Sequence, residues 1–288
     1  MSEPLKRITV PAIRATKKVR RLAMLTAYDC PSAQIVDRSG ADIVLVGDSL
    51  AMVVLGHPDT LSVTVDEMLH HTRAAARGTS RALLVGDMPW LSYHLSLDET
   101  VRNAAGFIRA GAQAVKIEGG RPSRIARVRA ILDAEIPVMG HIGLTPQSVN
   151  VFGGFKVQGK GADAAKQLMD EAMALDDAGC FAIVLECVPA ELAAWITDSV
   201  SVPTIGIGAG PACDGQVLVF HDLLGLYDGH TPKFVRRYAE AGKTMGEAVA
   251  RFVADVQEGR FPDAGSESFH VSSDDDLRRL YASFGAPA

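Results

Sequence analysis

Two apolar segments of the sequence end on an acidic residue. The run IVLVGDSL at 43–50 carries Asp48, and the run ALLVGDMPW at 82–90 carries Asp87. A single Asp after a strand is more often a turn residue or a helix N-cap than a ligand, and Asp29 before CPSAQ fits either description. Several acids that converge on one place would form a site, so the question is which fold brings strand ends together.

A third segment, QAVKIEGG at 113–120, places two charged residues inside a strand-like run. Side chains alternate across a strand, so Lys116 and Glu118 share one face while Val115 and Ile117 take the other. The apolar pair suits contact with a layer of helices, which leaves the charged pair pointing inward. Burying such groups is costly unless they are paired or bind something.

The carboxylates of Asp48, Asp87 and Glu118 define a candidate metal site. Three carboxylates at one end of a fold repel one another unless a cation holds them together. The set offers oxygen ligands, with no Cys or paired His nearby, and this chemistry suits Mg²⁺. Mn²⁺ or Co²⁺ would also occupy an oxygen site of this kind in vitro.

Other polar residues complete the set of candidates. Glu186, inside IVLECV, is the candidate base beside the metal, and its alternative role is an inter-strand salt bridge. His141 is a candidate substrate contact, although a lone His is often a hydrogen-bonded structural residue. Ser49 and Lys116 are placed to fix a substrate carboxylate.

A divalent metal and a positioned base are the equipment for removing a proton from the carbon next to a carbonyl. A 2-oxo acid would chelate the metal through its ketone and carboxylate oxygens, and the metal would stabilise the enolate. Such chemistry leads to aldol addition, retro-aldol cleavage or isomerisation. Residue types alone do not choose among these reactions.

The elements that must position these residues alternate between strands and helices. Strand-like runs are expected at 22–29, 41–48, 81–89, 113–120, 136–143, 180–188, 202–210 and 217–225. They are nearly continuously apolar, as in a parallel sheet that is covered on both faces. Helix-like stretches separate them, and several end on Gly just before the next strand. This order predicts an α/β protein with a single (β/α)8 TIM barrel, whose active site lies on the rim where the strands end.

The other architecture considered is an open doubly wound sheet. That fold usually opens with a glycine fingerprint, and GIGAGP at 206–211 puts Pro211 where the last glycine belongs. A tight turn explains this stretch as well as a phosphate site does. The loop at 141–161 is long enough to act as a lid, with Lys156 and Lys160 available to an anionic ligand.

Composition favours one large globular domain. The chain has 288 residues, of which 48% are hydrophobic and 22% charged. Its net charge of -5 gives no reason to expect nucleic acid or an anionic membrane as a partner. Thr9 is expected to start a short N-terminal helix, and the basic N-terminus lacks the apolar core of a secretory signal. The barrel domain is expected over 1–265, followed by a polar tail over 266–288.

The four cysteines, Cys30, Cys180, Cys187 and Cys213, form no CxxC pair and no zinc-type spacing. They are interpreted as reduced thiols. No apolar run approaches the roughly 20 residues that a membrane helix needs. A cytoplasmic protein is therefore expected.

The sequence resembles the ketopantoate hydroxymethyltransferase (3-methyl-2-oxobutanoate hydroxymethyltransferase) family from about residue 8 to about residue 270. The resemblance is carried by MLTAYD, LVGDSLAMVVLGHPDTLSVTVDEM, VKIEGG, GHIGLTPQSVNVFGGFKVQGKG, VLECVP and IGIGAGPACDGQ. It implies a Mg²⁺-dependent (β/α)8 barrel that transfers a one-carbon unit from 5,10-methylenetetrahydrofolate to 3-methyl-2-oxobutanoate. The product would be 2-dehydropantoate, in pantothenate and coenzyme A biosynthesis.

The resemblance also implies roles for particular residues of this sequence. The family's metal carboxylates fall on Asp48, Asp87 and Glu118. Its substrate contacts fall on Asp48, Ser49, Asp87 and Lys116, and its proton acceptor falls on Glu186. A large ring-like homo-oligomer, typically a homodecamer, is implied as well.

Three alternatives stay open at this point. The first is a Mg²⁺-dependent carbon–carbon lyase or mutase of the phosphoenolpyruvate mutase and isocitrate lyase type, which resembles this family in fold and metal site. Those lyases carry a catalytic cysteine in a K-C-G-H lid loop, and no cysteine here lies in such a loop. The second uses Lys116 as a Schiff-base nucleophile without a metal. The third is an inactive barrel that serves as a binding or scaffold protein.

Overall fold

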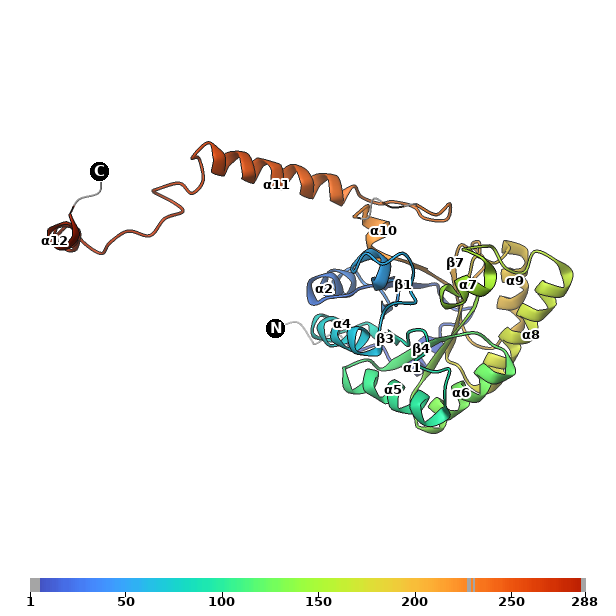
Figure 1. The fold of residues 1–288 in the computed structure, drawn as a ribbon. Coiled ribbons are helices and arrows are strands. Elements are labelled where there is room, and N and C mark those ends of the chain that lie inside the picture. The colour runs from blue at the N-terminus through green and yellow to red at the C-terminus, as the bar shows by residue number, and fades with distance from the viewer. Residues whose placement is uncertain (1–5, 227–228, 230, 286–288) are drawn as a thin grey trace. The chain divides into compact units, whose positions relative to one another are not determined.

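The described strands form one closed barrel and run parallel to one another, as Figure 1 shows. The structure is a computed structural model that describes residues 6–226, 229 and 231–285. The strands follow one another around the barrel in chain order, which confirms the predicted (β/α)8 fold. They are β1 Leu22–Thr26, β2 Ile43–Val46, β3 Leu83–Asp87, β4 Ala114–Glu118, β5 Val138–Gly143, β6 Ala182–Glu186, β7 Thr204–Ile207 and β8 Gly215–Leu218.

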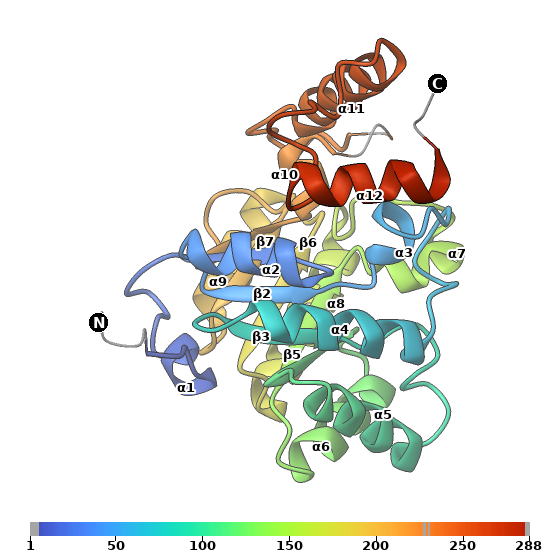
Figure 2. The same ribbon diagram turned by 90° about the vertical axis from the view of Figure 1, so that its left-hand side faces the viewer.

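Helices between the strands cover the outside of the barrel. They are α2 Cys30–Arg38, α3 Leu50–Val53, α4 Val65–Gly78, α5 Leu97–Arg109, α6 Pro122–Asp133, α7 Val149–Phe152, α8 Ala162–Ala178 and α9 Ala190–Ser199, with a 3₁₀ turn, η1, at Pro146–Ser148. Figure 2 shows α2, α4 and α5 side by side outside β2 and β3. A capping box between Thr64 and Glu67 starts α4. This reciprocal pairing satisfies backbone donors at the helix start.

Two apolar layers result from the alternation of side chains along the strands. One layer fills the inside of the barrel and includes Leu45, Val85 and Val184. The other lies between strands and helices and includes Val115 and Ile117 of β4, as predicted. Alternation therefore turns the charged residues of β4 inward.

The predicted N-terminal helix is present as α1, Val10–Arg14. The Thr9 side chain caps it by accepting a hydrogen bond from the Ala12 N–H. Ile13 is fully buried and belongs to the apolar cluster inside the barrel. The short helix therefore contributes to the barrel interior.

Gly86 explains why a glycine precedes the acid in β3. A Cβ at this position would lie 2.3 Å from Cδ1 of Phe107, a fully buried residue of α5. Only a glycine admits the helix this closely without a shift of one element. The next residue, Asp87, points to the opposite face of the strand, with Leu83 and Val85, into the barrel.

The end of the barrel differs from the prediction. The run expected as one strand at 217–225 divides between β8 and the helix α10, Phe220–Leu224. A continuous apolar run does not by itself distinguish a strand from a buried helix segment. Among the described residues, no helix separates β7 from β8, so the glycine-rich stretch at 206–211 is part of a short crossover.

The described chain forms two compact units, which meet in sequence between Ala239 and Glu240. This division comes earlier than residue 265, the predicted end of the barrel domain; that residues 240–265 fold with the barrel stays a prediction. The second unit contains α11, Ala241–Gln257, and α12, Asp274–Phe284, so the expected polar tail includes a helix. Within the described part of the chain, no helix has the length and apolar composition that a membrane span requires.

Candidate active site

The carboxyl ends of the strands surround a cavity of about 500 Å³. Its lining contains every site residue predicted from the sequence, namely Asp48, Ser49, Asp87, Lys116, Glu118, His141 and Glu186. Phe155 and Lys156, from the loop after β5, and Phe234, from the segment after α10, also line it. The position agrees with the rim on which TIM barrels build their active sites.

Lys116 is the buried cation of this cavity. Its side chain is 5% exposed, and Nζ lies 2.8 Å from Asp87 Oδ1 and 3.9 Å from Glu118 Oε1. The parallel register places Lys116 directly beside Asp87. Burial alone would lower the pKa of Lys116, but the surrounding carboxylates outweigh it and raise that pKa above its usual value. Lys116 is therefore an ammonium ion at neutral pH.

Each of the three carboxylates has one oxygen held by the protein. Gln147 Nε2 donates to Asp48 Oδ2 at 2.8 Å, and the Gln147 N–H donates to Glu118 Oε2 at 3.1 Å. The Asp48 N–H donates to Asp87 Oδ2 at 3.2 Å. Asp87 Oδ1 and Glu118 Oε1 are buried and form no hydrogen bond of acceptable geometry among the described residues. Their contacts are ion pairs, from Lys116 to both oxygens and from His141 to Glu118 Oε1.

The charges of these carboxylates are only partly balanced. Burial, together with repulsion from Asp87 and Glu118, raises the pKa of Asp48 well above its usual range. Burial also raises the pKa of Asp87, although Lys116 acts against this. Burial acts to raise the pKa of Glu118 too, but contacts with His141 and Lys116 hold it below its usual value. An added cation would relieve the repulsion that raises the pKa of both aspartates.

The donor set fits a hard divalent cation. Carboxylate oxygens are the ligands that Mg²⁺ prefers, and two of the buried oxygens lack a hydrogen-bond partner. Among residues 6–226, 229 and 231–285, however, no group of three or more His, Cys, Asp or Glu is already arranged to hold a metal ion. Lys116 lies between the buried oxygens of Asp87 and Glu118, so cation binding would require these side chains to adjust.

His141 connects the carboxylate cluster to the opposite wall of the cavity. Its Nδ1 lies 3.4 Å from Glu118 Oε1 and 3.2 Å from Lys116 Nζ, and its Nε2 lies 3.2 Å from Glu186 Oε2. Burial and Lys116 act to lower the pKa of His141, but Glu118 and Glu186 raise it to about 9. The raised pKa favours a protonated His141 ring, in which each nitrogen carries a hydrogen and faces a carboxylate. The alternative is a neutral ring whose Nδ1 accepts a hydrogen bond from Lys116 Nζ.

His141→Gln is expected to remove a pH-dependent part of the stability. The pKa rises from 6.5 in the unfolded chain to about 9 in the folded one, a difference of about 3 kcal/mol. Because the folded pKa is the higher one, this stabilisation is complete below pH 6.5 and is lost as the pH rises through 9. Urea unfolding of metal-free protein gives the free energy of unfolding of the native protein and of His141→Gln at pH 6 and at pH 10. The stabilisation is the amount by which the difference between the two proteins falls from pH 6 to pH 10.

The exposed His70 of α4 provides the matched control for that experiment. His70→Gln should leave the pH dependence of unfolding unchanged. A difference between native protein and His141→Gln that is the same at both pH values would show that folding does not raise the pKa of His141.

Glu186 ends β6 on the wall of the cavity. Its side chain is 17% exposed and its Oε2 lies close to His141 Nε2, without the alignment of a good hydrogen bond. The next residue, Cys187, has a positive φ of 47° and also lines the cavity. Burial, and to a smaller extent the charge of Glu186, raises the pKa of the Cys187 thiol to about 12. Glu186 is therefore the accessible basic group of this wall, and Cys187 is a neutral thiol.

The remaining sequence candidates separate into two groups. Ser49 Oγ lies 2.9 Å from the Tyr28 hydroxyl and faces the cavity, and Lys156 lines its mouth. Lys160 is exposed and does not line the cavity. Asp29 forms a capping box with Ser32 at the start of α2, so the interpretation as a helix cap is confirmed.

Two buried residues of the site were missed by the sequence analysis. Gln147, in η1, contacts two of the carboxylates, and the hydroxyl of Tyr93 donates to Gln147 Oε1. The only signal for Gln147 was its place in LTPQS, just after the end of β5. Neither Gln nor Tyr is charged at neutral pH, so the pattern of acidic and basic residues in the sequence does not include them.

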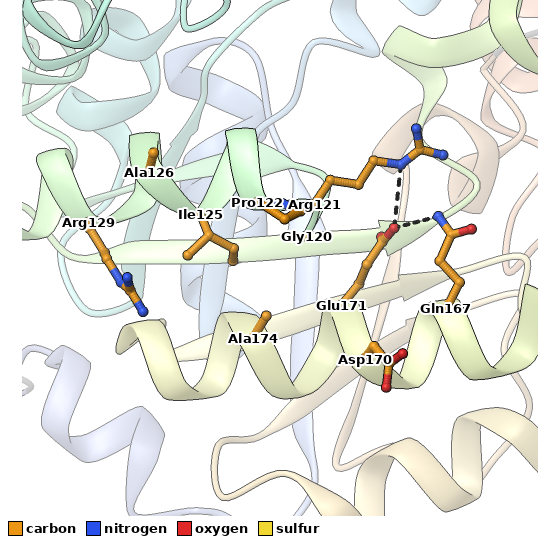
Figure 3. A pocket seen from close by; sticks show the side chains of 10 residues that line it. All are labelled: Gly120, Arg121, Pro122, Ile125, Ala126, Arg129, Gln167, Asp170, Glu171 and Ala174. Carbon is orange, nitrogen blue, oxygen red and sulfur yellow. Dashed lines mark hydrogen bonds and ion pairs between the residues drawn. The ribbon is translucent and has the colours of Figure 1, made fainter.

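A second hollow lies on the outside of the barrel, between α6 and α8 (Figure 3). Glu171 lies there 3.7 Å from Arg121 Nε and accepts a hydrogen bond from Gln167 Nε2 at 2.8 Å. The Arg121 side chain is 71% exposed, so this ion pair is screened by solvent. None of the residues that line the hollow is a buried charged group comparable with Lys116.

Solved structures resemble the chain in fold at low sequence identity. A phosphonopyruvate hydrolase in complex with oxalate and Mg²⁺ gives a TM-score of 0.58 at 14% identity, covering 96% of this chain and 98% of that one. A 2,3-dimethylmalate lyase of the phosphoenolpyruvate mutase and isocitrate lyase superfamily gives a TM-score of 0.53 at 16% identity, covering 95% and 98%. Similarity at this level supports the barrel fold alone.

Sequence comparison is more specific. A profile of ketopantoate hydroxymethyltransferase matches residues 7–264. A 3-methyl-2-oxobutanoate hydroxymethyltransferase from Syntrophobacter fumaroxidans is 59% identical over 258 residues, covering 89% of this chain and 91% of the relative. One of the same name from Syntrophomonas wolfei is 55% identical over 277 residues, covering 96% and 99%. The chain belongs to the ketopantoate hydroxymethyltransferase family.

Proposed function

We propose that the enzyme transfers a one-carbon unit from 5,10-methylenetetrahydrofolate to 3-methyl-2-oxobutanoate in a Mg²⁺-dependent reaction that gives 2-dehydropantoate for pantothenate biosynthesis. Membership of the family supports the hydroxymethyl transfer. The observation that carries the chemistry is the buried cluster of Asp48, Asp87, Glu118 and Lys116 at one end of the cavity, with Glu186 on its wall.

In this proposal Asp48, Asp87 and Glu118 hold the metal ion. When bound, Mg²⁺ supplies a positive charge that stabilises the enolate of a 2-oxo acid. A phosphonopyruvate hydrolase of similar fold has been solved in complex with Mg²⁺ and oxalate, a small dianion, and this supports the choice of Mg²⁺. A cation, the Lys116 ammonium group, already lies beside the buried oxygens Asp87 Oδ1 and Glu118 Oε1, which supports the choice of these carboxylates as ligands.

The protein's own residues bind the 2-oxo acid and move its proton. The Lys116 ammonium group attracts the substrate carboxylate, and the Ser49 hydroxyl is available to donate to it. Glu186 takes the proton from carbon 3, and the neighbouring His141 ring orients the Glu186 carboxylate. Water adds to the methylene carbon of the folate as both of its bonds to nitrogen break, and the two protons of water go to those nitrogens, so tetrahydrofolate and formaldehyde result. Carbon 3 then forms a bond to the formaldehyde carbon, and the proton held by Glu186 passes to the formaldehyde oxygen, so 2-dehydropantoate leaves.

Proton exchange separates the two halves of this reaction. The enzyme is incubated with Mg²⁺ and 3-methyl-2-oxobutanoate in D₂O, and the carbon-3 proton is followed by NMR before methylenetetrahydrofolate is added. Enzyme-dependent exchange that EDTA abolishes, followed by 2-dehydropantoate, is the expected result. Exchange without product would contradict the proposed carbon donor, and the absence of both would contradict the assignment of metal and base.

The alternatives have less support. The lyase and mutase alternative rests on a fold similarity at low identity. The cavity cysteine, Cys187, directly follows β6, and its thiol has a raised pKa. A Schiff-base nucleophile must be a neutral amine, whereas the raised pKa of Lys116 keeps it protonated. Borohydride with a 2-oxo acid should therefore trap no adduct on Lys116. The scaffold reading predicts Mg²⁺ binding without turnover of any 2-oxo acid.

Self-association is part of the proposal, with the homodecamer implied by the family resemblance as the expected state. Within α11, Met245, Val249, Phe252 and Val256 recur at helical spacing and form one apolar face. An apolar face of this kind suits an association surface, and a second copy of the chain is the proposed occupant. Light scattering of the full chain gives the number of copies directly.

A further inference from the structure

Gln147 is a neutral residue that hydrogen-bonds to two of the three carboxylates of the site, Asp48 and Glu118. Its side chain is buried, and Nε2 donates both to Asp48 Oδ2 at 2.8 Å and to the Met88 carbonyl oxygen at 3.0 Å. Its backbone N–H donates to Glu118 Oε2 at 3.1 Å. One residue of the loop after β5 therefore fixes carboxylates that follow β2 and end β4.

Tyr93 fixes the orientation of the Gln147 amide. The buried Tyr93 hydroxyl donates to Gln147 Oε1 and accepts from the Glu118 N–H at 3.3 Å. Both partners of Nε2 are acceptors only, so a flipped amide would place its oxygen against two oxygens. The Arg124 guanidinium lies 4.6 Å from the centre of the Tyr93 ring and holds the ring from its face.

Gln147 contacts Asp48 through Oδ2 and Glu118 through Oε2, so it does not occupy Asp48 Oδ1 or Glu118 Oε1. Gln147 is neutral, so it holds Asp48 and Glu118 without cancelling their charges, as a lysine or an arginine at this position would. Groups that hydrogen-bond to metal ligands orient them, and loss of one typically weakens metal binding about 10- to 100-fold.

We propose that Gln147 is a positioning residue that sets Asp48 and Glu118 for a divalent cation, with Tyr93 fixing the amide. The inference rests on the proposed function for the identity of the metal ligands. This role also links the loop after β5 to the metal site. The loop must adopt its folded position for Gln147 to hydrogen-bond to Asp48 and Glu118.

Mg²⁺ titration by calorimetry tests this with Gln147→Met, which keeps the side-chain length and removes the amide. Its Mg²⁺ affinity is expected to fall about 10- to 100-fold, and the Mg²⁺ concentration that half-saturates proton exchange of 3-methyl-2-oxobutanoate should rise by the same factor. Tyr93→Phe should cause a smaller loss, under about tenfold, because Nε2 keeps both acceptors.

Gln113→Met is the matched control. The Gln113 amide also makes two hydrogen bonds, one from the Leu84 N–H at 2.9 Å and one to the Gly111 carbonyl at 2.7 Å, but at the start of β4, away from the cavity. It should lower the unfolding temperature without changing Mg²⁺ affinity. Native affinity in folded Gln147→Met, or an equal loss in Gln113→Met, would overturn the positioning role. Failure of the native enzyme to bind Mg²⁺ would instead overturn the metal site on which the role depends.

Discussion

Glu186→Gln is expected to bind Mg²⁺ and 3-methyl-2-oxobutanoate with nearly native affinity but to lose about 10²- to 10⁴-fold in the rate of carbon-3 proton exchange. The amide keeps the size of the side chain and can still contact His141, but it has no basic oxygen for the proton. Glu186 makes no contact with Asp48, Asp87 or Lys116 in the structure, so the substitution should leave the arrangement of these three side chains unchanged. NMR exchange in D₂O measures the rate, and calorimetry measures binding.

Glu191→Gln controls for the loss of a negative charge near β6. Glu191 is exposed in the first turn of α9 and does not line the cavity. Its exchange rate should equal that of the native enzyme. A near-native rate in Glu186→Gln would remove Glu186 as the essential base.

The sequence predicts the parts of the site that follow from the two-residue alternation of side chains along a strand. In β4, alternation alone places Val115 and Ile117 against the helices and Lys116 and Glu118 inside, and the structure agrees. The parallel register then aligns Lys116 with Asp87 and Glu118 with His141. Once the barrel is assigned, the strand ends meet on one rim, so the acids converge without any knowledge of their distances.

Contacts made by loop residues do not follow from such a period. Gln147 reaches Asp48 across 99 positions of the chain, and nothing in LTPQS indicates that an amide rather than a water molecule holds that carboxylate. The division of the last apolar run into β8 and α10 is similar, because the run lacks an internal Gly or Pro to mark where the strand ends. The pairing of His141 with two carboxylates also depends on three strands lying side by side.

Asp87→Asn is expected to weaken Mg²⁺ binding more than 100-fold, which is about 2.7 kcal/mol, and to abolish metal-dependent exchange. The change removes one of three anionic ligands and leaves an amide that still accepts from the Asp48 N–H. The free energy of unfolding of the metal-free protein should change little, because the substitution removes one favourable and one unfavourable electrostatic interaction. Lys116 loses its partner at 2.8 Å, while Asp48 is freed from a repulsion that raises its pKa. Lys116 also keeps Glu118 at 3.9 Å, so it does not become an unpaired buried charge.

Unfolding with and without Mg²⁺ separates these contributions. A ligand at about 100 times its Kd stabilises the folded state by about 2.7 kcal/mol, so native enzyme should gain that amount and Asp87→Asn should gain almost none. Asp98→Asn, in the exposed first turn of α5, removes the same charge away from the cavity and should gain as much as native enzyme. Equal Mg²⁺ stabilisation in Asp87→Asn would contradict its assignment as a ligand. The buried Asp87–Lys116 and Glu118–His141 pairs would then be structural ion pairs.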